Sequence, residues 1–258
     1  MRHRANGFRL PLLSSRPPTP FRMRLLLLSN STNPGQAYLD HAVDWLRHFL
    51  GEGVRRVLFV PFAGVTISFD DYAGRVRERL EPLGYAVESL HAVTCDLGEA
   101  VTKAEAVLVG GGNSFHLLDF VYRHHLLDPL RARVADGMPY VGWSAGSNLA
   151  CPTIRTTNDM PIVEPPTLDA LGLIPFQINP HYTDAHPPGH QGETRAQRLL
   201  EFVAVNPTLP VAGLPEGTAL RVEGARIEKL GPHPVRLFAH GEEPREVAER
   251  DLSFLLSA

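Results

Sequence analysis

Short apolar runs alternate with stretches of helical periodicity along the first 150 residues of the chain. The apolar runs at 24–28, 54–60, 86–90, 106–109 and 138–141 have the length and continuous hydrophobicity of buried strands. Between them, apolar residues recur every three or four positions, which predicts helices over 38–49, 69–83 and 115–134. Buried strands that alternate with helices are typical of a parallel sheet covered on both faces, so we expect an α/β fold.

The pattern changes after residue 151. An irregular, proline-rich stretch is followed by helical spacing over 193–205. Four short apolar segments then follow, separated by Gly and Pro, at 209–214, 219–222, 225–230 and 235–238. They predict an antiparallel C-terminal extension of the sheet. No repeat or composition break divides the chain, so we expect a single domain over 23–258.

Residues 1–22 differ from the rest of the chain, with five arginines, four prolines and no acidic residue. Their apolar patch at 10–13 is shorter than the roughly 7–15 residues of a secretory signal core. We expect a disordered extension or a start codon assigned too far upstream, while a transit peptide remains an alternative.

Composition narrows the functional classes. The 258 residues carry 25 Lys and Arg against 28 Asp and Glu, a formal charge of −3, which favours neither nucleic acid nor anionic lipid as a partner. No apolar run reaches the ~20 residues of a membrane span. The two cysteines, Cys95 and Cys151, have neither disulfide-framework nor zinc-motif spacing, which suits a cytoplasmic protein.

A serine between two glycines follows the expected strand at 138–141. In Gly142-Trp143-Ser144-Ala145-Gly146, a sharp strand-to-helix turn would expose the hydroxyl of Ser144. The loops at 29–35, 61–66 and 110–114 also follow expected strands and should meet Ser144 at the same rim of the sheet. Ser144 is therefore our candidate nucleophile, provided that a base and an acid accompany it.

His181 is the candidate base, because an apolar segment ends in Asn179-Pro180-His181 as a strand would. His186 and His190 are nearby competitors. Two acids compete for the third position: Glu216, in Gly213-Leu214-Pro215-Glu216-Gly217, and Asp159. We favour Glu216, because the order Ser144, His181, Glu216 places all three residues at strand ends. Asp159 could instead orient the imidazole or the substrate.

Backbone amides near Ser144 are candidates for oxyanion stabilisation. We expect those of Gly111, Gly112 and Ala145 to form this site. An ordinary strand-to-helix turn with Asn113 at the helix N-terminus is an equal alternative for 110–113. Arg155 and Asn113 are candidate substrate-binding residues, Arg155 because a guanidinium can bind a carboxylate through two hydrogen bonds.

With these residues in place, the chain resembles the serine peptidase family that contains the α-aspartyl dipeptidases and the cyanophycinases. The matching segments occur in order along the chain, at 25–32, 61–66, 109–113, 142–146, 151–161, 177–181 and 213–217. The resemblance implies a flavodoxin-like fold related to class I glutamine amidotransferases. It also implies hydrolysis of dipeptides with an N-terminal aspartate, with no metal or cofactor.

The resemblance implies Ser144 as nucleophile and His181 as base, and it leaves the acid open between Glu216 and Asp159. The sequence does not specify the oligomeric state, and we expect a monomer or a homodimer. An amidotransferase-type domain that supplies ammonia to a partner is the alternative function, although its usual nucleophile is cysteine. A non-enzymatic binding protein on the same scaffold is a third.

Overall fold

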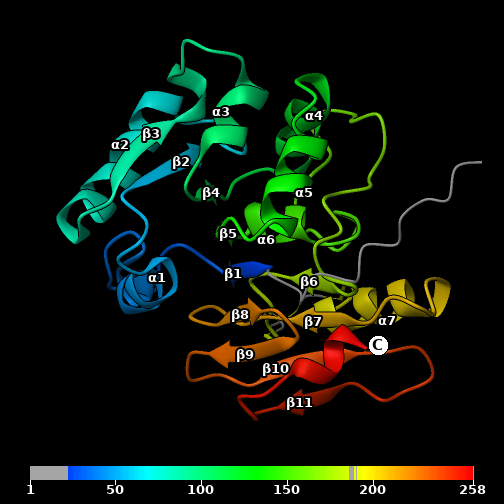
Figure 1. Ribbon diagram of the computed structural model, residues 1–258. Helices are drawn as coiled ribbons and strands as arrows, with labels where there is room; N and C mark the ends of the chain where they lie inside the picture. The colour runs from blue at the N-terminus through cyan, green and yellow to red at the C-terminus, as the bar shows by residue number, and fades with distance from the viewer. Residues whose placement is uncertain (1–22, 186–188, 190, 258) are drawn as a thin grey trace, which may run out of the picture.

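The computed structural model describes residues 23–185, 189 and 191–257, which form two β-sheets with helices packed against them (Figure 1). The segment 1–22, for which we expected disorder, lies outside the described residues, as do His186 and His190. Seven strands form the main sheet, in the spatial order β3-β2-β4-β5-β1-β8-β9. They are β1 (Arg24–Leu28), β2 (Arg56–Val60), β3 (Ala86–Ser89), β4 (Val107–Val109), β5 (Tyr140–Trp143), β8 (Ala219–Glu223) and β9 (Arg226–Leu230).

The second sheet contains four strands in the order β11-β10-β7-β6. They are β6 (Gln177–Asn179), β7 (Val211–Gly213), β10 (Val235–Phe238) and β11 (Arg245–Val247). The α-helices are α1 (Val43–Leu50), α2 (Phe69–Leu80), α3 (Leu97–Lys103), α4 (Ser114–Arg123), α5 (Leu127–Ala135), α6 (Ala145–Ala150) and α7 (Arg195–Val205). Short 3₁₀ helices are η1 (Asp40–Ala42), η2 (Glu81–Leu83), η3 (Leu90–Ala92) and η4 (Ser253–Leu256).

Alternating side chains of the main sheet enter two hydrophobic cores on its opposite faces. Leu25 and Leu27 of β1 pack in one core with apolar residues of α4, α5 and α6. Leu26 and Leu28 enter the other core, with residues of α1 and α2. Because both faces are covered, the strands are apolar at almost every position, which is the pattern visible in the sequence.

The parallel strands have the spatial order of flavodoxin-like sheets. That order is 2-1-3-4-5. Here the first four places are taken, in spatial order, by β3, β2, β4 and β5, and the N-terminal β1 takes the fifth. Strands β8 and β9 then continue the sheet in antiparallel pairing beyond β1. The predicted mostly parallel α/β sheet with an antiparallel C-terminal extension is confirmed.

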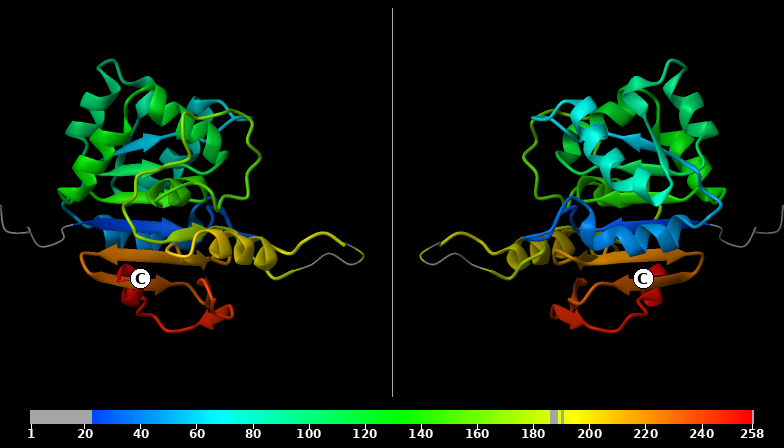
Figure 2. Two further views of the ribbon diagram at one scale, coloured as in Figure 1. Left: turned by 90° about the vertical axis from the view of Figure 1, so that its right-hand side faces the viewer. Right: turned by 90° about the vertical axis from the view of Figure 1, so that its left-hand side faces the viewer.

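Two details of the prediction are wrong. The expected helix over 115–134 is broken into α4 and α5, because His125 adopts a left-handed φ of 53° that an α-helix cannot include. The C-terminal strands do not all extend the main sheet, since β7 and β10 pair in the second sheet. In Figure 2 the orange-to-red C-terminal strands lie below β1, at the end of the molecule opposite to α3.

Candidate active site

Ser144 lies at a sharp turn between β5 and α6, with φ 52° and ψ −112°. The glycines on either side of it allow this turn to pack closely. A Cβ at Gly142 would lie 2.4 Å from the carbonyl oxygen of Gly146, and a Cβ at Gly146 would lie 2.2 Å from that of Val109. No side chain fits at either position, so the glycines are required for the turn that exposes the Ser144 hydroxyl.

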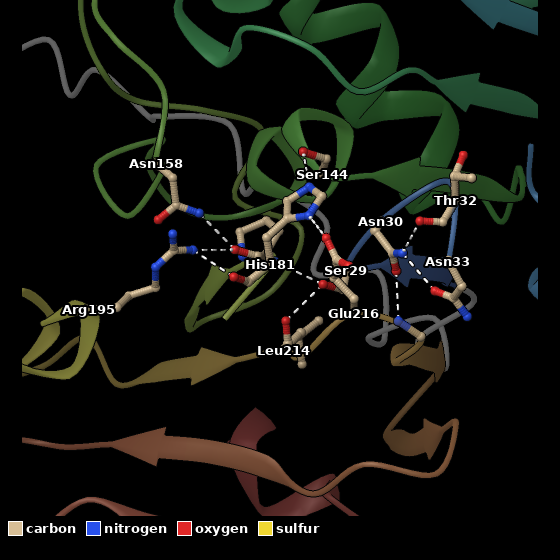
Figure 3. A network of polar contacts seen from close by, with 12 residues as sticks. Ser29, Asn30, Thr32, Asn33, Ser144, Asn158, His181, Arg195, Leu214 and Glu216 are labelled. Atoms are coloured by element: carbon tan, nitrogen blue, oxygen red, sulfur yellow. Dashed lines mark hydrogen bonds and ion pairs between the residues drawn. The ribbon is translucent and has the colours of Figure 1, made fainter. Parts of the chain in front are cut away.

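The structure brings His181 onto Ser144. His181 follows β6, and its Nε2 lies 3.0 Å from Oγ of Ser144 (Figure 3). Its backbone also has a left-handed φ of 52°, which is uncommon for a residue with a side chain. Side chains hold this conformation at both ends, because the N–H donates to Oγ of Ser29 at 2.9 Å and the carbonyl accepts from Arg195 at 2.7 Å.

The structure also brings Glu216 onto the far side of the same imidazole. Oε1 of Glu216 lies 2.8 Å from Nδ1 of His181. A neutral imidazole donates from one nitrogen and accepts at the other. With the Nδ1 proton directed at the carboxylate, Nε2 can accept the proton of the Ser144 hydroxyl. Both side chains remain partly open to solvent, with 39% of His181 and 49% of Glu216 exposed.

The loop after β1 holds the segment that carries Glu216, a role that sequence reasoning missed. The backbone N–H of Gly217 donates to Oδ1 of Asn30 at 2.8 Å, and Ser29 Oγ donates to the carbonyl of Leu214. Asn30 is itself fixed, because its Nδ2 donates to Oδ1 of Asn33. The signal was present, since this polar loop follows an expected strand and was predicted to lie at the same rim.

Asp159 makes different contacts from those of a triad acid. Its Oδ2 accepts from the backbone N–H of Ser114 at 2.7 Å and from the Thr157 hydroxyl at 2.9 Å. Its Oδ1 has no hydrogen-bond partner among the described residues, although Asp159 lines the same cavity as Ser144. Asp159 therefore anchors the 157–160 segment to the N-terminus of α4, where a negative charge is favourable.

Candidate oxyanion donors surround Ser144. Ala145 is the first residue of α6, so its N–H has no carbonyl one helical turn earlier to bind. In the preceding loop, Gly110 and Asn113 donate their N–H groups to Val60 and Ala63, respectively. Gly111 lies against the nucleophile, because a Cβ placed there would be 3.1 Å from Cβ of Ser144.

Asn113 acts as the N-terminal cap of α4. Its Oδ1 accepts from the N–H of His116 at 3.0 Å, and its Nδ2 donates to the carbonyl of Met160 at 2.8 Å. Both polar atoms of its side chain are therefore already used within the protein. Asn113 also lines the cavity beside Ser144, and its Oδ1 and Nδ2 can each make one further hydrogen bond, so its expected part in substrate binding stays a prediction.

A cavity of about 800 Å³ opens beside Ser144 and His181. Its wall includes Gly112 and Asp159, and Arg75 is the one Lys or Arg among the described residues that line it. The Arg75 side chain makes no hydrogen bond or ion pair with any residue in the described ranges. The cavity thus contains one unpaired cation and one carboxylate oxygen without a partner.

Arg155 lies elsewhere, which corrects its expected place in the substrate pocket. It lines a separate hollow of about 320 Å³, together with Arg195 and Arg198 of α7. The segment 156–160 contributes residues to both hollows. Sequence proximity to Ser144 suggested Arg155, but it lines the hollow beside α7 and not the cavity beside Ser144.

The remaining candidate groups do not compete with Ser144. Burial raises the pKa of the Cys151 thiol to about 12, so it stays protonated and unreactive near neutral pH. Within 23–185, 189 and 191–257, no three or more His, Cys, Asp or Glu side chains are grouped closely enough to hold a metal ion. No helix in the described part of the chain is long and apolar enough to span a membrane.

Comparison with known proteins identifies the family of the chain. The chain matches peptidase family S51 over residues 25–230. A protein named peptidase E from Nostoc sp. is 50% identical over 234 residues, covering 90% of this chain and 96% of that protein. Another from Citrobacter koseri is 52% identical over 230 residues, covering 88% of this chain and all of that protein. The chain therefore belongs to peptidase family S51.

Solved structures support the fold. A peptidase from an acI-B1 actinobacterium aligns with a TM-score of 0.68 at 18% identity, covering 91% of this chain and 98% of that one. A Listeria monocytogenes EGD-e protein described as peptidase E aligns with a TM-score of 0.62 at 24% identity, covering 81% and 98%. Family membership and the named relatives confirm the assignment to the serine peptidases and do not favour the amidotransferase alternative.

Proposed function

We propose that the chain hydrolyses dipeptides with an N-terminal aspartate, with Ser144 as nucleophile, His181 as base and Glu216 as the acid of the triad. The observation that carries the proposal is the unbroken hydrogen-bonded line from Ser144 through His181 to Glu216. The resemblance to α-aspartyl dipeptidases supplies the substrate class. Relatives named peptidase E at about half identity support it.

In the acylation step, Oγ of Ser144 attacks the carbonyl carbon of the aspartyl residue while Nε2 of His181 takes its proton. Glu216 stabilises the resulting imidazolium and holds its orientation. The N–H groups of Gly112 and Ala145 are the proposed donors to the tetrahedral oxyanion, with that of Gly111 beside them. As the peptide bond breaks, His181 gives the proton to the leaving amine.

In the deacylation step, a water molecule replaces the departed amino acid. His181 removes a proton from this water, whose oxygen attacks the aspartyl ester on Ser144. The second tetrahedral intermediate collapses as the imidazolium returns the proton to Oγ of Ser144. Free aspartate leaves and the enzyme is restored without any external cofactor.

The charges of the cavity support an assignment of substrate contacts. We place the side-chain carboxylate of the substrate aspartate at the unpaired guanidinium of Arg75. Arg75 thus takes the role that the sequence suggested for Arg155. The free Oδ1 of Asp159 would receive the α-ammonium group of the same dipeptide. A short zwitterionic peptide would thus satisfy both charges beside the Ser144 hydroxyl.

A dipeptide panel tests this function. Asp-Leu should be cleaved, and Asn-Leu should lose about 10²- to 10⁴-fold in kcat/KM, because it leaves a cationic site unpaired. Arg75→Gln should raise KM for Asp-Leu, while Arg155→Gln, the matched control, should leave it unchanged. Equal turnover of Asp-Leu and Asn-Leu contradicts the proposed specificity, and an unchanged KM in Arg75→Gln contradicts the assigned contact.

The setting of the enzyme is also proposed. Residues 23–258 would act as one domain, which the shared core supports because it includes Leu25, Ile178 and Val235 from both sheets. We propose a cytoplasmic monomer or homodimer, in keeping with the two free thiols of Cys95 and Cys151. Cell fractionation and sedimentation of the purified chain test these two statements.

A further inference from the structure

A buried tyrosine lies beneath the loop that carries the proposed oxyanion donors. Tyr72 of α2 packs in the core against Phe59 and Trp143, and 6% of it is exposed. Its hydroxyl donates to the carbonyl oxygen of Gly111 at 2.8 Å. It also accepts from Nε1 of Trp143 at 3.2 Å and from the Tyr38 hydroxyl at 3.4 Å.

The chemistry of these partners fixes the direction of the Tyr72 proton. The indole N–H of Trp143 is only a donor, so the Tyr72 oxygen must accept from it. A backbone carbonyl is only an acceptor, so the Tyr72 proton must point at Gly111. Burial raises the pKa of Tyr72, which keeps this proton in place near neutral pH.

The Gly111 carbonyl determines where the next N–H points. The peptide unit between Gly111 and Gly112 is planar and trans, so its C=O and N–H point in opposite directions. A hydroxyl that holds the carbonyl of Gly111 on the Tyr72 side therefore directs the N–H of Gly112 to the other side. Gly112 lines the same cavity as Ser144.

Close packing leaves this loop little other freedom. A Cβ at Gly110 would lie 2.6 Å from the Tyr72 hydroxyl oxygen, and one at Gly112 would lie 2.1 Å from the carbonyl oxygen of Ala63. The N–H of Asn113 donates to that same carbonyl at 2.8 Å. The loop is thus fixed at both ends, and rotation of the peptide between Gly111 and Gly112 is opposed by the Tyr72 hydrogen bond.

We propose that Tyr72 is a positioning residue for catalysis: its hydroxyl, held by the indole of Trp143, fixes the Gly111 carbonyl and thereby aims the Gly112 N–H at the oxyanion. This inference rests on the proposed function of Ser144 and its oxyanion site. It also assigns a role to Trp143, which lies between Gly142 and Ser144: through Tyr72, its indole connects the turn that carries the nucleophile to the loop that carries the oxyanion donors.

Replacing Tyr72 by phenylalanine tests the relay, because it removes the hydroxyl and keeps the ring. Tyr72→Phe should lower kcat for Asp-Leu by about 10- to 100-fold and change KM by less than about threefold. The reason is that the Gly112 N–H would no longer point at the oxyanion, which forms only in the transition state and not in the bound substrate. The matched control is Tyr85→Phe. Tyr85 lies in the same core, and its hydroxyl also contacts main-chain carbonyls, those of Arg47 and Gly51.

Two binding measurements separate positioning from a purely structural role. The α-aminoboronic acid analogue of aspartate forms a tetrahedral adduct with serine, and its Ki should rise about as much as kcat falls. In a Ser144→Ala background, the Kd of uncleaved Asp-Leu should be unchanged by Tyr72→Phe. Trp143→Phe should also lower kcat and raise Ki, by smaller factors than Tyr72→Phe. It replaces Tyr72→Phe as the test if that variant does not fold.

The relay is wrong if Tyr72→Phe keeps kcat and Ki within about threefold of the wild type. It is also wrong if Asp-Leu and the boronate lose affinity equally, because that outcome means general damage to the pocket. The proposed function fails separately, if the wild type binds the boronate but does not cleave Asp-Leu. In that case the comparison of Ki values still decides the role of Tyr72.

Discussion

At the scale of single residues, two neighbouring side chains of the proposed triad are attached to unusual backbone. Ser144 and His181 both have φ near 52°, a region that residues with a side chain rarely occupy. Such strain persists only where surrounding contacts enforce it. Tight glycine packing enforces it at Ser144, and the contacts with Ser29 and Arg195 do so at His181. The backbone is thus shaped by the requirement that a hydroxyl and an imidazole meet.

The two candidate acids can be separated by matched substitutions that remove charge and keep shape. Glu216→Gln should lower kcat by about 10²- to 10⁴-fold with little change in KM, because the imidazolium loses its counter-charge. Asp159→Asn should mainly raise KM for Asp-Leu, since Asp159 lines the substrate cavity and is the proposed partner of the α-ammonium group. Steady-state kinetics on the purified variants gives both numbers. A larger loss of kcat in Asp159→Asn than in Glu216→Gln would reverse the assignment of the acid.

At the scale of helices and strands, the sequence predicts what hydrophobic periodicity controls. The parallel strands and α2 lie within a few residues of their expected bounds, because their apolar positions must face the two cores. The break between α4 and α5 was missed because the left-handed His125 has no Gly or Pro beside it, although Pro129 in the first turn of α5 is a signal of a new helix start. The second sheet escaped too, because periodicity identifies a strand but does not specify its neighbour.

Site residues followed the same rule. Ser144, His181 and Glu216 could be proposed from the sequence because each follows an apolar run and lies within two residues of glycine or proline. Arg75 and Tyr72 were not found, because they lie within a helix whose pattern shows only that one face is buried. Their proposed roles depend on the cavity that both residues line and on the Gly111 carbonyl that Tyr72 contacts. Only the three-dimensional arrangement supplies this information.

A buried carboxylate joins the C-terminal strands, and it makes stability depend on pH. Glu228 of β9 contacts both Arg221 of β8 and Arg250 near the C-terminus. Burial opposes its ionisation, but the two guanidinium groups outweigh this and hold the pKa of Glu228 below its ordinary value. Because the folded pKa is depressed, the stabilisation is complete above the unfolded pKa of about 4.3 and is lost as pH falls through the folded pKa.

Glu228→Gln should therefore destabilise the protein near pH 7 by about 1–3 kcal/mol, because two arginines lose an ionic hydrogen-bond partner. The difference from the wild type should shrink as pH falls below about 4, where the wild-type carboxylate also becomes neutral. Urea unfolding at several pH values measures this. Glu242→Gln, at an exposed position, is the control. A destabilisation that is the same at every pH would mean that packing, and not charge, is responsible.

At the scale of the whole molecule, the proposed triad is divided between the two sheets. Ser144 follows β5 of the main sheet, whereas His181 and Glu216 follow the parallel strands β6 and β7 of the second sheet. The distance between the hydroxyl and the imidazole therefore depends on how the sheets are joined. Ser29, at the end of β1, makes this junction by bonding the N–H of His181 and the carbonyl of Leu214.

Removing the Ser29 hydroxyl should lower kcat by more than the accompanying loss of stability can explain. In Ser29→Ala the N–H of His181 and the carbonyl of Leu214 lose their shared partner, so we expect about 1–3 kcal/mol of destabilisation. The imidazole of His181 should then move away from Ser144, and kcat for Asp-Leu should fall by about 10-fold or more.

Ser89→Ala is the matched control, because Ser89 is also buried, at the end of β3, and its hydroxyl forms a hydrogen bond with a histidine, His91. Urea unfolding and initial rates on both variants compare the two effects. Similar stabilities with a low kcat in Ser29→Ala alone would locate the catalytic geometry at the junction of the sheets, whereas a wild-type kcat in Ser29→Ala would show that β6 and β7 hold His181 without help from β1.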